Sequence, residues 1–117
     1  MKQILAIRKD VKLTKGDFLK VMATASLESA KKSEKNSGKK FQDWLRKGQK
    51  KVTIRVDSLK EMELLRNILL DKKIIVVEID QGLESIKVQR NNEIIALGIG
   101  PELDKILDPI TSSYKLI

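Results

Sequence analysis

Residues 51–79 read KVTIRVDSLKEMELLRNILLDKKIIVVEI. Over residues 51–56, valine and isoleucine alternate with polar residues, which is typical of a strand with one buried face. Ser58 and Glu61 then have the spacing of a capping box, which predicts the start of an amphipathic helix. The β-branched run over residues 73–79 predicts a second strand, central in its sheet and buried on both sides. A strand, a helix and a strand in succession favour an α/β fold.

The rest of the chain continues this alternation. Apolar periodicity predicts strands over residues 2–9 and 93–99, helices over 14–32, 39–47 and 102–107, and a polar connection over 33–38. Pro109 is expected to end the last helix, and Asn91-Asn92 predicts a turn. With 117 residues, the chain has the length of one domain, so we expect a single α/β sandwich over residues 1–117.

The composition excludes several kinds of chemistry. The chain has no cysteine and no histidine, so it offers no disulfide, thiolate metal site, cysteine nucleophile or imidazole base. Its only aromatic residues are two phenylalanines, one tryptophan and one tyrosine, which argues against an extended stacking platform for single-stranded RNA. It has no phosphate-binding P-loop, and Gly98 and Gly100 lack the third glycine of a dinucleotide fingerprint. No cofactor and no metal are expected.

Positive charge is concentrated in residues 31–51, here called the lysine-rich segment. The chain carries a formal net charge of +8, and this segment holds nine lysines and arginines but only two acids. Such a directed field favours a polyanionic partner. The alternative is a solvated segment that only keeps the protein soluble. No apolar run approaches the length of a membrane span, and the first residues turn charged too soon for a signal peptide, so we expect a cytoplasmic protein without membrane contact.

Several short motifs, taken in order, resemble those of the type 2 peptidyl-tRNA hydrolases of archaea and eukaryotes. Early in the chain these are Arg8-Lys9-Asp10 after the first strand and the helix start Lys12-Leu13-Thr14-Lys15-Gly16. Later ones are Trp44 with Gly48-Gln49-Lys50-Lys51-Val52, then Asp57-Ser58-Leu59, Asp80-Gln81-Gly82, Leu97-Gly98-Ile99-Gly100-Pro101 and the tail over residues 108–117. The resemblance covers nearly the full length, and it depends on order and spacing rather than on any single motif.

This resemblance implies a three-layer α/β/α sandwich with a mixed four-stranded sheet. It also implies hydrolysis of the ester between a peptide and the tRNA ribose. Lys15 would then anchor the tRNA end or the oxyanion, and Asp80 would orient the attacking water. The tRNA itself would be held by basic residues, namely Lys12, Lys39, Lys40, Arg46, Lys47, Lys50 and Lys51.

The chain departs from the family pattern at four positions of the expected site. Asp17, Val21, Thr24 and Glu84 stand where the family has a lysine, a glutamine, a histidine and a threonine. Ionised Asp17 and Glu84 accept hydrogen bonds but donate none, so with Asp80 they would place negative charge where an oxyanion develops.

Three of these departures, and Asp80 itself, also have a reading unrelated to catalysis. Asp17 suits the third position of a helix, where the helix dipole stabilises an acid, and Val21 suits a helix core position. Thr24 could bond back to the carbonyl of Lys20, and Asp80 could be a plain turn residue. Three carboxylates could alternatively bind Mg²⁺, although their spacing is inferred only through the resemblance.

Two hypotheses therefore stay open. In the first, the chain is a divergent peptidyl-tRNA hydrolase. In the second, it is a catalytically weakened or inactive homologue that binds tRNA or another polyanion without cleaving it. A homodimer is expected only from the general frequency of two-fold assemblies.

Overall fold

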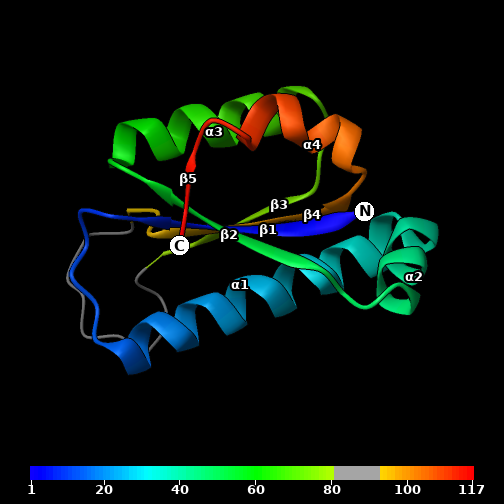
Figure 1. The fold of residues 1–117 in the computed structure, drawn as a ribbon, viewed down its shortest axis with the longest axis horizontal. Coiled ribbons are helices and arrows are strands. Elements are labelled where there is room, and N and C mark those ends of the chain that lie inside the picture. Colours follow the sequence, from blue (N-terminus) through cyan, green and yellow to red (C-terminus); the bar gives the residue numbers. More distant parts are fainter. Residues whose placement is uncertain (81–92) are drawn as a thin grey trace.

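The computed structural model describes residues 1–80 and 93–117, and it is a sheet between two layers of helices (Figure 1). The strands are β1 (Lys2–Arg8), β2 (Lys51–Val56), β3 (Val76–Ile79), β4 (Ala96–Glu102) and β5 (Lys115–Leu116). The helices are α1 (Lys15–Asn36), α2 (Gly38–Arg46), α3 (Leu59–Asp71) and α4 (Asp104–Thr111). Figure 1 shows α1 and α2 on one face of the sheet and α3 and α4 on the other. The predicted three-layer sandwich is confirmed.

The sheet is mixed and has the strand order β3-β4-β1-β2-β5. The two-residue strand β5, which is too short to show a periodicity, makes it five-stranded rather than four-stranded. β1 and β2 are parallel, whereas β4 runs antiparallel to both of its neighbours β1 and β3. β1, β2 and β3 therefore all end at one edge of the sheet, here called the carboxyl edge. Along it, the register aligns Ile79, Ala96, Ile7 and Arg55 in one row across four strands.

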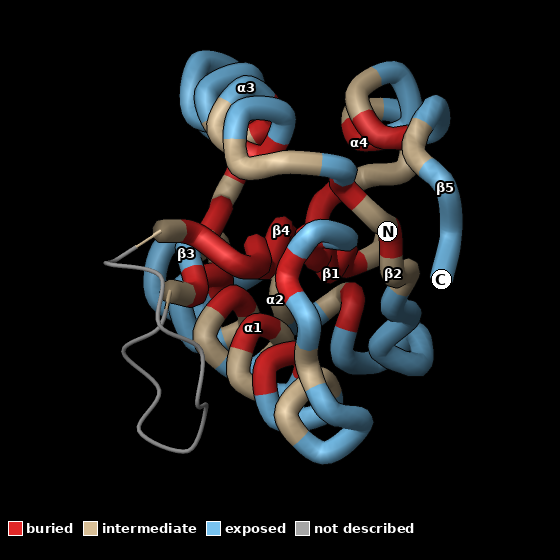
Figure 2. Tube along the Cα trace, turned by 90° about the vertical axis from the view of Figure 1, so that its left-hand side faces the viewer, coloured by how far each residue is buried: buried red, intermediate tan, exposed pale blue. Residues whose placement is uncertain are grey.

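The pleat of β1 divides the core in two. Ile4 and Ala6 belong to the larger cluster beneath α3 and α4, and Leu5 and Ile7 belong to the cluster beneath α1. Figure 2 shows the resulting pattern, in which the central strands are buried and the outer helix surfaces are exposed.

Helix α1 lies directly against the backbone of β4 at Gly98. A Cβ atom built there would come 2.8 Å from the Cβ of Ser29 and closer still to the carbonyl oxygen of Ala25. The buried Ser29 hydroxyl donates to the carbonyl oxygen of Gly100, two residues further along β4. The motif over residues 97–101 thus lets the helix backbone approach the sheet without an intervening side chain.

The local predictions hold best in the first half of the chain. β1, α2, β2 and α3 begin and end within one residue of the predicted positions, except that α2 exposes Leu45, which the helical pattern placed inward. Helix α1 continues to Asn36, so the predicted polar connection over 33–38 is wrong for most of its length. The helix continues because Ser33, like Ser29, is fully buried and extends its inner face.

Three predictions in the second half need correction. β3 begins at Val76, three residues later than predicted, and is an edge strand rather than a central one. Its residues Val76 and Ile79 are buried because helices cover both faces of the strand. β4 begins three residues later than predicted and extends through Pro101, since its glycines fit against α1 and a tight backbone turn, with φ of +81° at Gly100. The last helix was predicted over 102–107, but α4 begins at Asp104, because Glu102 still belongs to β4, and it continues to Thr111 with Pro109 inside it. The predicted turns at 81–82 and 91–92 lie outside the described residues.

Candidate active site at the carboxyl edge

The start of α1 and the end of β3 both lie at the carboxyl edge. Helix α1 begins there because the Thr14 hydroxyl accepts a hydrogen bond from the backbone N–H of Asp17, at 3.1 Å. Lys15, in the first turn, is exposed. Asp80 follows β3 directly and is half-buried. The two residues proposed for catalysis therefore lie at the same edge of the sheet, although they are 65 positions apart in the sequence.

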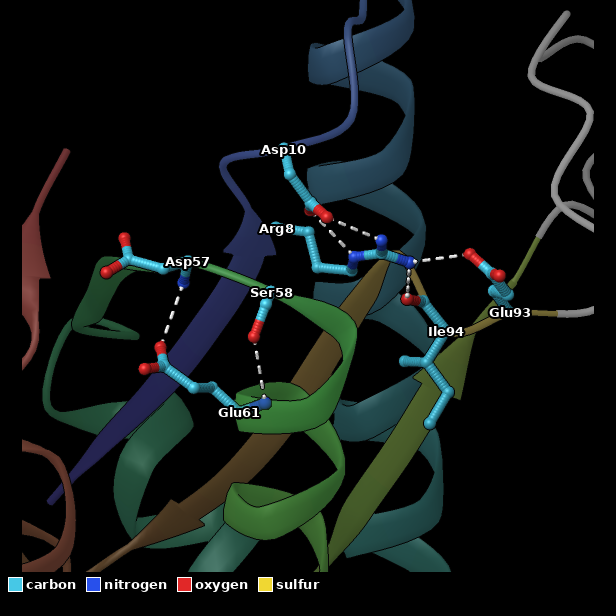
Figure 3. Close-up of polar contacts among 7 residues, drawn as sticks. All are labelled: Arg8, Asp10, Asp57, Ser58, Glu61, Glu93 and Ile94. Carbon is cyan, nitrogen blue, oxygen red and sulfur yellow. Dashed lines mark hydrogen bonds and ion pairs between the residues drawn. The ribbon is translucent and has the colours of Figure 1, made fainter.

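A buried arginine ties this edge together (Figure 3). The Nε and Nη2 atoms of Arg8 donate to the two carboxylate oxygens of Asp10, at 2.9 and 2.8 Å. Its Nη1 atom donates to Glu93 and to the carbonyl oxygen of Ile94, both at 3.1 Å. Only 3% of the Arg8 side chain is exposed. One guanidinium therefore joins the connection before α1 to the segment that leads into β4.

The charge of this arginine is secured by its partners. Hydrogen bonding to Asp10 raises the pKa of Arg8, burial acts in the opposite direction, and Glu93 adds to the increase. Both carboxylates are partly open to solvent, at 41% and 37%. The cluster therefore has a fixed cation at its centre and acids at its rim, which suits a structural clamp.

The residues that replace family positions have different surroundings. Val21 is fully buried in the core beneath α1, as its place on the apolar face of the helix predicts. Asp17 contributes its backbone N–H to the helix cap. Thr24 is half-buried, and within the described residues it makes no hydrogen bond to Lys20, so that prediction is wrong. Glu84 lies outside the described residues, and the suggested group of three carboxylates is therefore not placed.

The lysine-rich segment lies at the other end of α1. Lys12 is the one predicted tRNA-binding residue next to the carboxyl edge, whereas α2 lies beyond the far end of α1 (Figure 1). At 1.5 Å per residue, Lys35 lies about 30 Å along the helix from Lys15. The predicted catalytic and tRNA-binding residues thus form two separate regions joined by one helix.

The cations of this far region differ in their local partners. Lys40 pairs with the buried Glu102 at 2.7 Å, Arg46 with Asp43 at 2.9 Å, and the Lys51 ammonium lies 5.2 Å from the centre of the Trp44 ring. Lys39, Lys47 and Lys50, all exposed, make no ion pair with any residue in 1–80 or 93–117. Among the predicted tRNA-binding residues of this segment, these three are the most available to phosphates.

Arg55 is a further residue at this edge, and it is not among the residues predicted from the sequence. Because Ile54 and Val56 face α3 and α4, the strand pleat turns Arg55 toward α1, beside Ile7. Its Nε atom is buried and has no hydrogen-bond partner among the described residues. The alternation of residues in β2 could have indicated this, because it places a charged residue on a face of the sheet that a helix is expected to cover.

None of the helices in the described part of the chain combines the length and the hydropathy needed to cross a membrane.

Comparison with known proteins gives a consistent result over the full length. The family model described as peptidyl-tRNA hydrolase PTH2 matches residues 1–117. A peptidyl-tRNA hydrolase of Thermoplasma acidophilum is 35% identical over 117 residues, covering 99% of this chain and 97% of that protein. The peptidyl-tRNA hydrolases of Nanoarchaeum equitans and Thermoplasma volcanium are 34% and 31% identical to this chain. The matches cover 99% and 100% of this chain, respectively, and 98% of each of those two proteins.

Proposed function

The chain belongs to the PTH2 family of peptidyl-tRNA hydrolases, and on that premise we propose that it hydrolyses the ester between a peptide and the terminal ribose of tRNA. The observation that carries the proposal is the family match over all 117 residues. The position of Lys15 and Asp80 at one edge of the sheet supports their assignment as catalytic residues.

The reaction needs a water molecule, a base and a site for the oxyanion. Because the chain has neither cysteine nor histidine, we propose that water attacks the ester carbonyl directly. Asp80 accepts a proton from this water, and the Lys15 ammonium stabilises the negative charge that develops on the carbonyl oxygen. Collapse of the intermediate breaks the bond to the ribose oxygen, which leaves protonated, and releases the peptide as a carboxylic acid.

The first turn of α1 modulates this chemistry. Asp17 stands two residues after Lys15, where the positive end of the helix dipole favours an acid. Its carboxylate also offsets part of the positive charge that Lys15 presents to the oxyanion. We therefore expect a slower hydrolase than one with a second lysine at this position.

The lysine-rich segment binds the tRNA. Lys12 holds phosphates close to the ester, and Lys39, Lys40, Arg46, Lys47, Lys50 and Lys51 hold phosphates further along the molecule. Because such contacts release counterions, they raise affinity without reading sequence.

The test is cleavage of purified peptidyl-tRNA by the wild type and by Lys15→Ala and Asp80→Asn. We expect turnover by the wild type and a loss of about 10²–10³ in kcat for each variant. Lys105→Ala removes one exposed positive charge from α4 and is the matched control, with unchanged kcat. Salt-sensitive tRNA binding without turnover by the wild type would replace the proposal with the non-cleaving homologue. Full activity of both variants would remove Lys15 and Asp80 from the site.

We also propose a cytoplasmic location, where peptidyl-tRNA arises, and a homodimer. Leu19 and Leu27 on α1 are 65% and 59% exposed and are the apolar side chains that a second copy would cover. Sedimentation velocity of the wild type and of Leu27→Lys tests the dimer. A monomeric wild type at micromolar concentration contradicts it.

A further inference from the structure

A small hollow opens between α1 and β2 at the carboxyl edge. It has a volume of about 250 Å³. Ile7, Leu13 and Phe18 contribute apolar surface to it, and Lys9, Lys15 and Arg55 contribute positive charge. Among the residues that the structure describes, no aspartate or glutamate lines it; Ile117 also borders it, and Arg8, a further lining residue, is already paired with acids. The hollow therefore combines an apolar wall with three cations, Lys9, Lys15 and Arg55, that form no ion pair within residues 1–80 and 93–117.

Arg55 is the residue that gives this hollow a chemical preference. It has no ion pair and no hydrogen-bonded acceptor within the described residues, and its Nε atom is buried. It also borders a second hollow near Asp57 and Glu61, yet it pairs with neither acid. A partly buried guanidinium without an acceptor favours an anion that brings planar or tetrahedral oxygens within its reach.

We infer that the hollow binds one unpaired nucleotide of the tRNA 3′ end, with Arg55 on its phosphate and Phe18 against its base. A volume of this size admits a single base but no duplex, and one aromatic face with adjacent cations is the usual recognition of an unstacked nucleotide. The register row Arg55–Ile7–Ala96–Ile79 separates Arg55 from the end of β3 by three strand spacings, about 14 Å. The phosphate at Arg55 and the ester at Asp80 therefore belong to different nucleotides.

The inference rests on the proposed function, because it takes the ester to lie near Asp80. Its test uses binding rather than cleavage, so that the two fail separately. The ligands are deacylated tRNA with its 3′-terminal CCA and the same tRNA with CCA removed. The proteins are the wild type, Arg55→Gln, Arg55→Lys and the control Lys60→Gln, which removes one exposed positive charge on α3, across the sheet from the hollow.

We expect the wild type to bind tRNA with CCA about tenfold more tightly than trimmed tRNA. Arg55→Gln abolishes most of this difference and leaves the affinity for trimmed tRNA within about twofold of the wild-type value. Arg55→Lys keeps part of the difference between the two tRNAs, and Lys60→Gln keeps all of it. A wild type that binds both tRNAs equally overturns the inference without reference to any variant. An equal loss by Arg55→Gln for both tRNAs also overturns it, since Arg55 would then act only as general charge.

Discussion

The Nη1 atom of Arg8 lies 3.1 Å from the Oε2 atom of Glu93, so one side chain at the end of β1 holds a segment 85 residues further along the chain. The same guanidinium holds Asp10, on the way to α1. The segment that leads into α1 and the segment that leads into β4 are therefore fixed relative to each other by a single residue.

Replacing Arg8 is expected to destabilise the protein. In Arg8→Met, two carboxylates lose their shared cation and the carbonyl oxygen of Ile94 loses a donor. We expect a decrease of about 2–3 kcal/mol in the free energy of unfolding, measured by urea denaturation. Arg46→Met removes the exposed pair with Asp43 and should cost less than about 1 kcal/mol. Equal losses in the two variants would show that the Arg8 cluster is no clamp.

Restoring the family's glutamine at position 21 is expected to destabilise the protein. Val21 is fully buried among apolar side chains, so Val21→Gln buries an amide without an evident partner. We expect a loss of about 1–3 kcal/mol, measured by thermal or urea unfolding. Lys20→Gln places the same side chain at an exposed position of the same helix and should be nearly neutral. A stable Val21→Gln variant with increased hydrolysis would place position 21 in the active site instead.

The close contact between α1 and β4 predicts a large effect from a single methyl group. Gly98→Ala forces the added Cβ against Ala25 and Ser29, and we expect it to lower the free energy of unfolding by about 1–3 kcal/mol. Gly38→Ala is the control, because a Cβ there meets nothing within 4 Å. It should leave stability unchanged or raise it by up to about 1 kcal/mol. If the two variants unfolded at the same denaturant concentration, the packing at Gly98 would be looser than described.

Removing two of the lysines without ion pairs should weaken tRNA binding. For Lys39→Gln combined with Lys47→Gln, we expect a lower affinity and a salt dependence whose log–log slope falls by about one per lysine. The matched control is Lys60→Gln combined with Lys105→Gln, on the opposite face of the sheet. Fluorescence anisotropy at several salt concentrations gives both slopes. Identical slopes for the two double variants would discard the lysine-rich segment as a binding surface.

Lys40 differs from Lys39 and Lys47 because it pairs with a buried acid. Its partner Glu102 has only 8% of its side chain exposed, so Lys40→Gln leaves a buried carboxylate without its cation. We expect a stability loss in this variant along with any effect on binding. For this reason it is unsuitable as a pure test of phosphate contact.

Tyr114 predicts a pH dependence in the alkaline range. Burial raises the pKa of Tyr114 above its usual 10.0, and the charge of Glu61 adds to the increase. Above the ordinary pKa the unfolded chain loses the proton while the folded protein keeps it, so stability falls as pH rises through this window. Below pH 9 the contribution is complete. Tyr114→Phe should show a smaller decrease between pH 9 and 11 in urea titrations, and an unchanged pH profile would contradict the assignment.

Where a signal is local, the fold could be predicted closely from the sequence. The Thr14 and Ser58 caps begin α1 and α3 as expected, with the hydroxyls accepting from the N–H groups of Asp17 and Glu61. The carboxylate of Glu61 accepts from the backbone of Asp57 rather than from that of the cap residue itself. The alternation in β2 gives both its limits and its buried face. In each case the determining residues are within four positions of one another.

Features that depend on distant partners could not be predicted. The edge position of β3 and the late start of β4 depend on how strands pair and how α1 lies on Gly98. The guanidinium of Arg8 meets Glu93 and Ile94 only in the folded chain. Lys15 and Asp80 could be selected through the resemblance to the hydrolase family, but their common location follows from the antiparallel placement of β4 between β1 and β3.

Helix α1 is continuous over 22 residues, and this has a consequence for which RNAs the protein can distinguish. A rigid rod of about 33 Å fixes the spacing between the site that would hold the 3′ end and the outlying lysines. An RNA shorter than this spacing can engage one of them at a time, whereas a longer one engages both and gains their combined affinity. The protein would then distinguish RNAs by their length as well as by their chemistry, because the length of α1 sets the distance that an RNA must span.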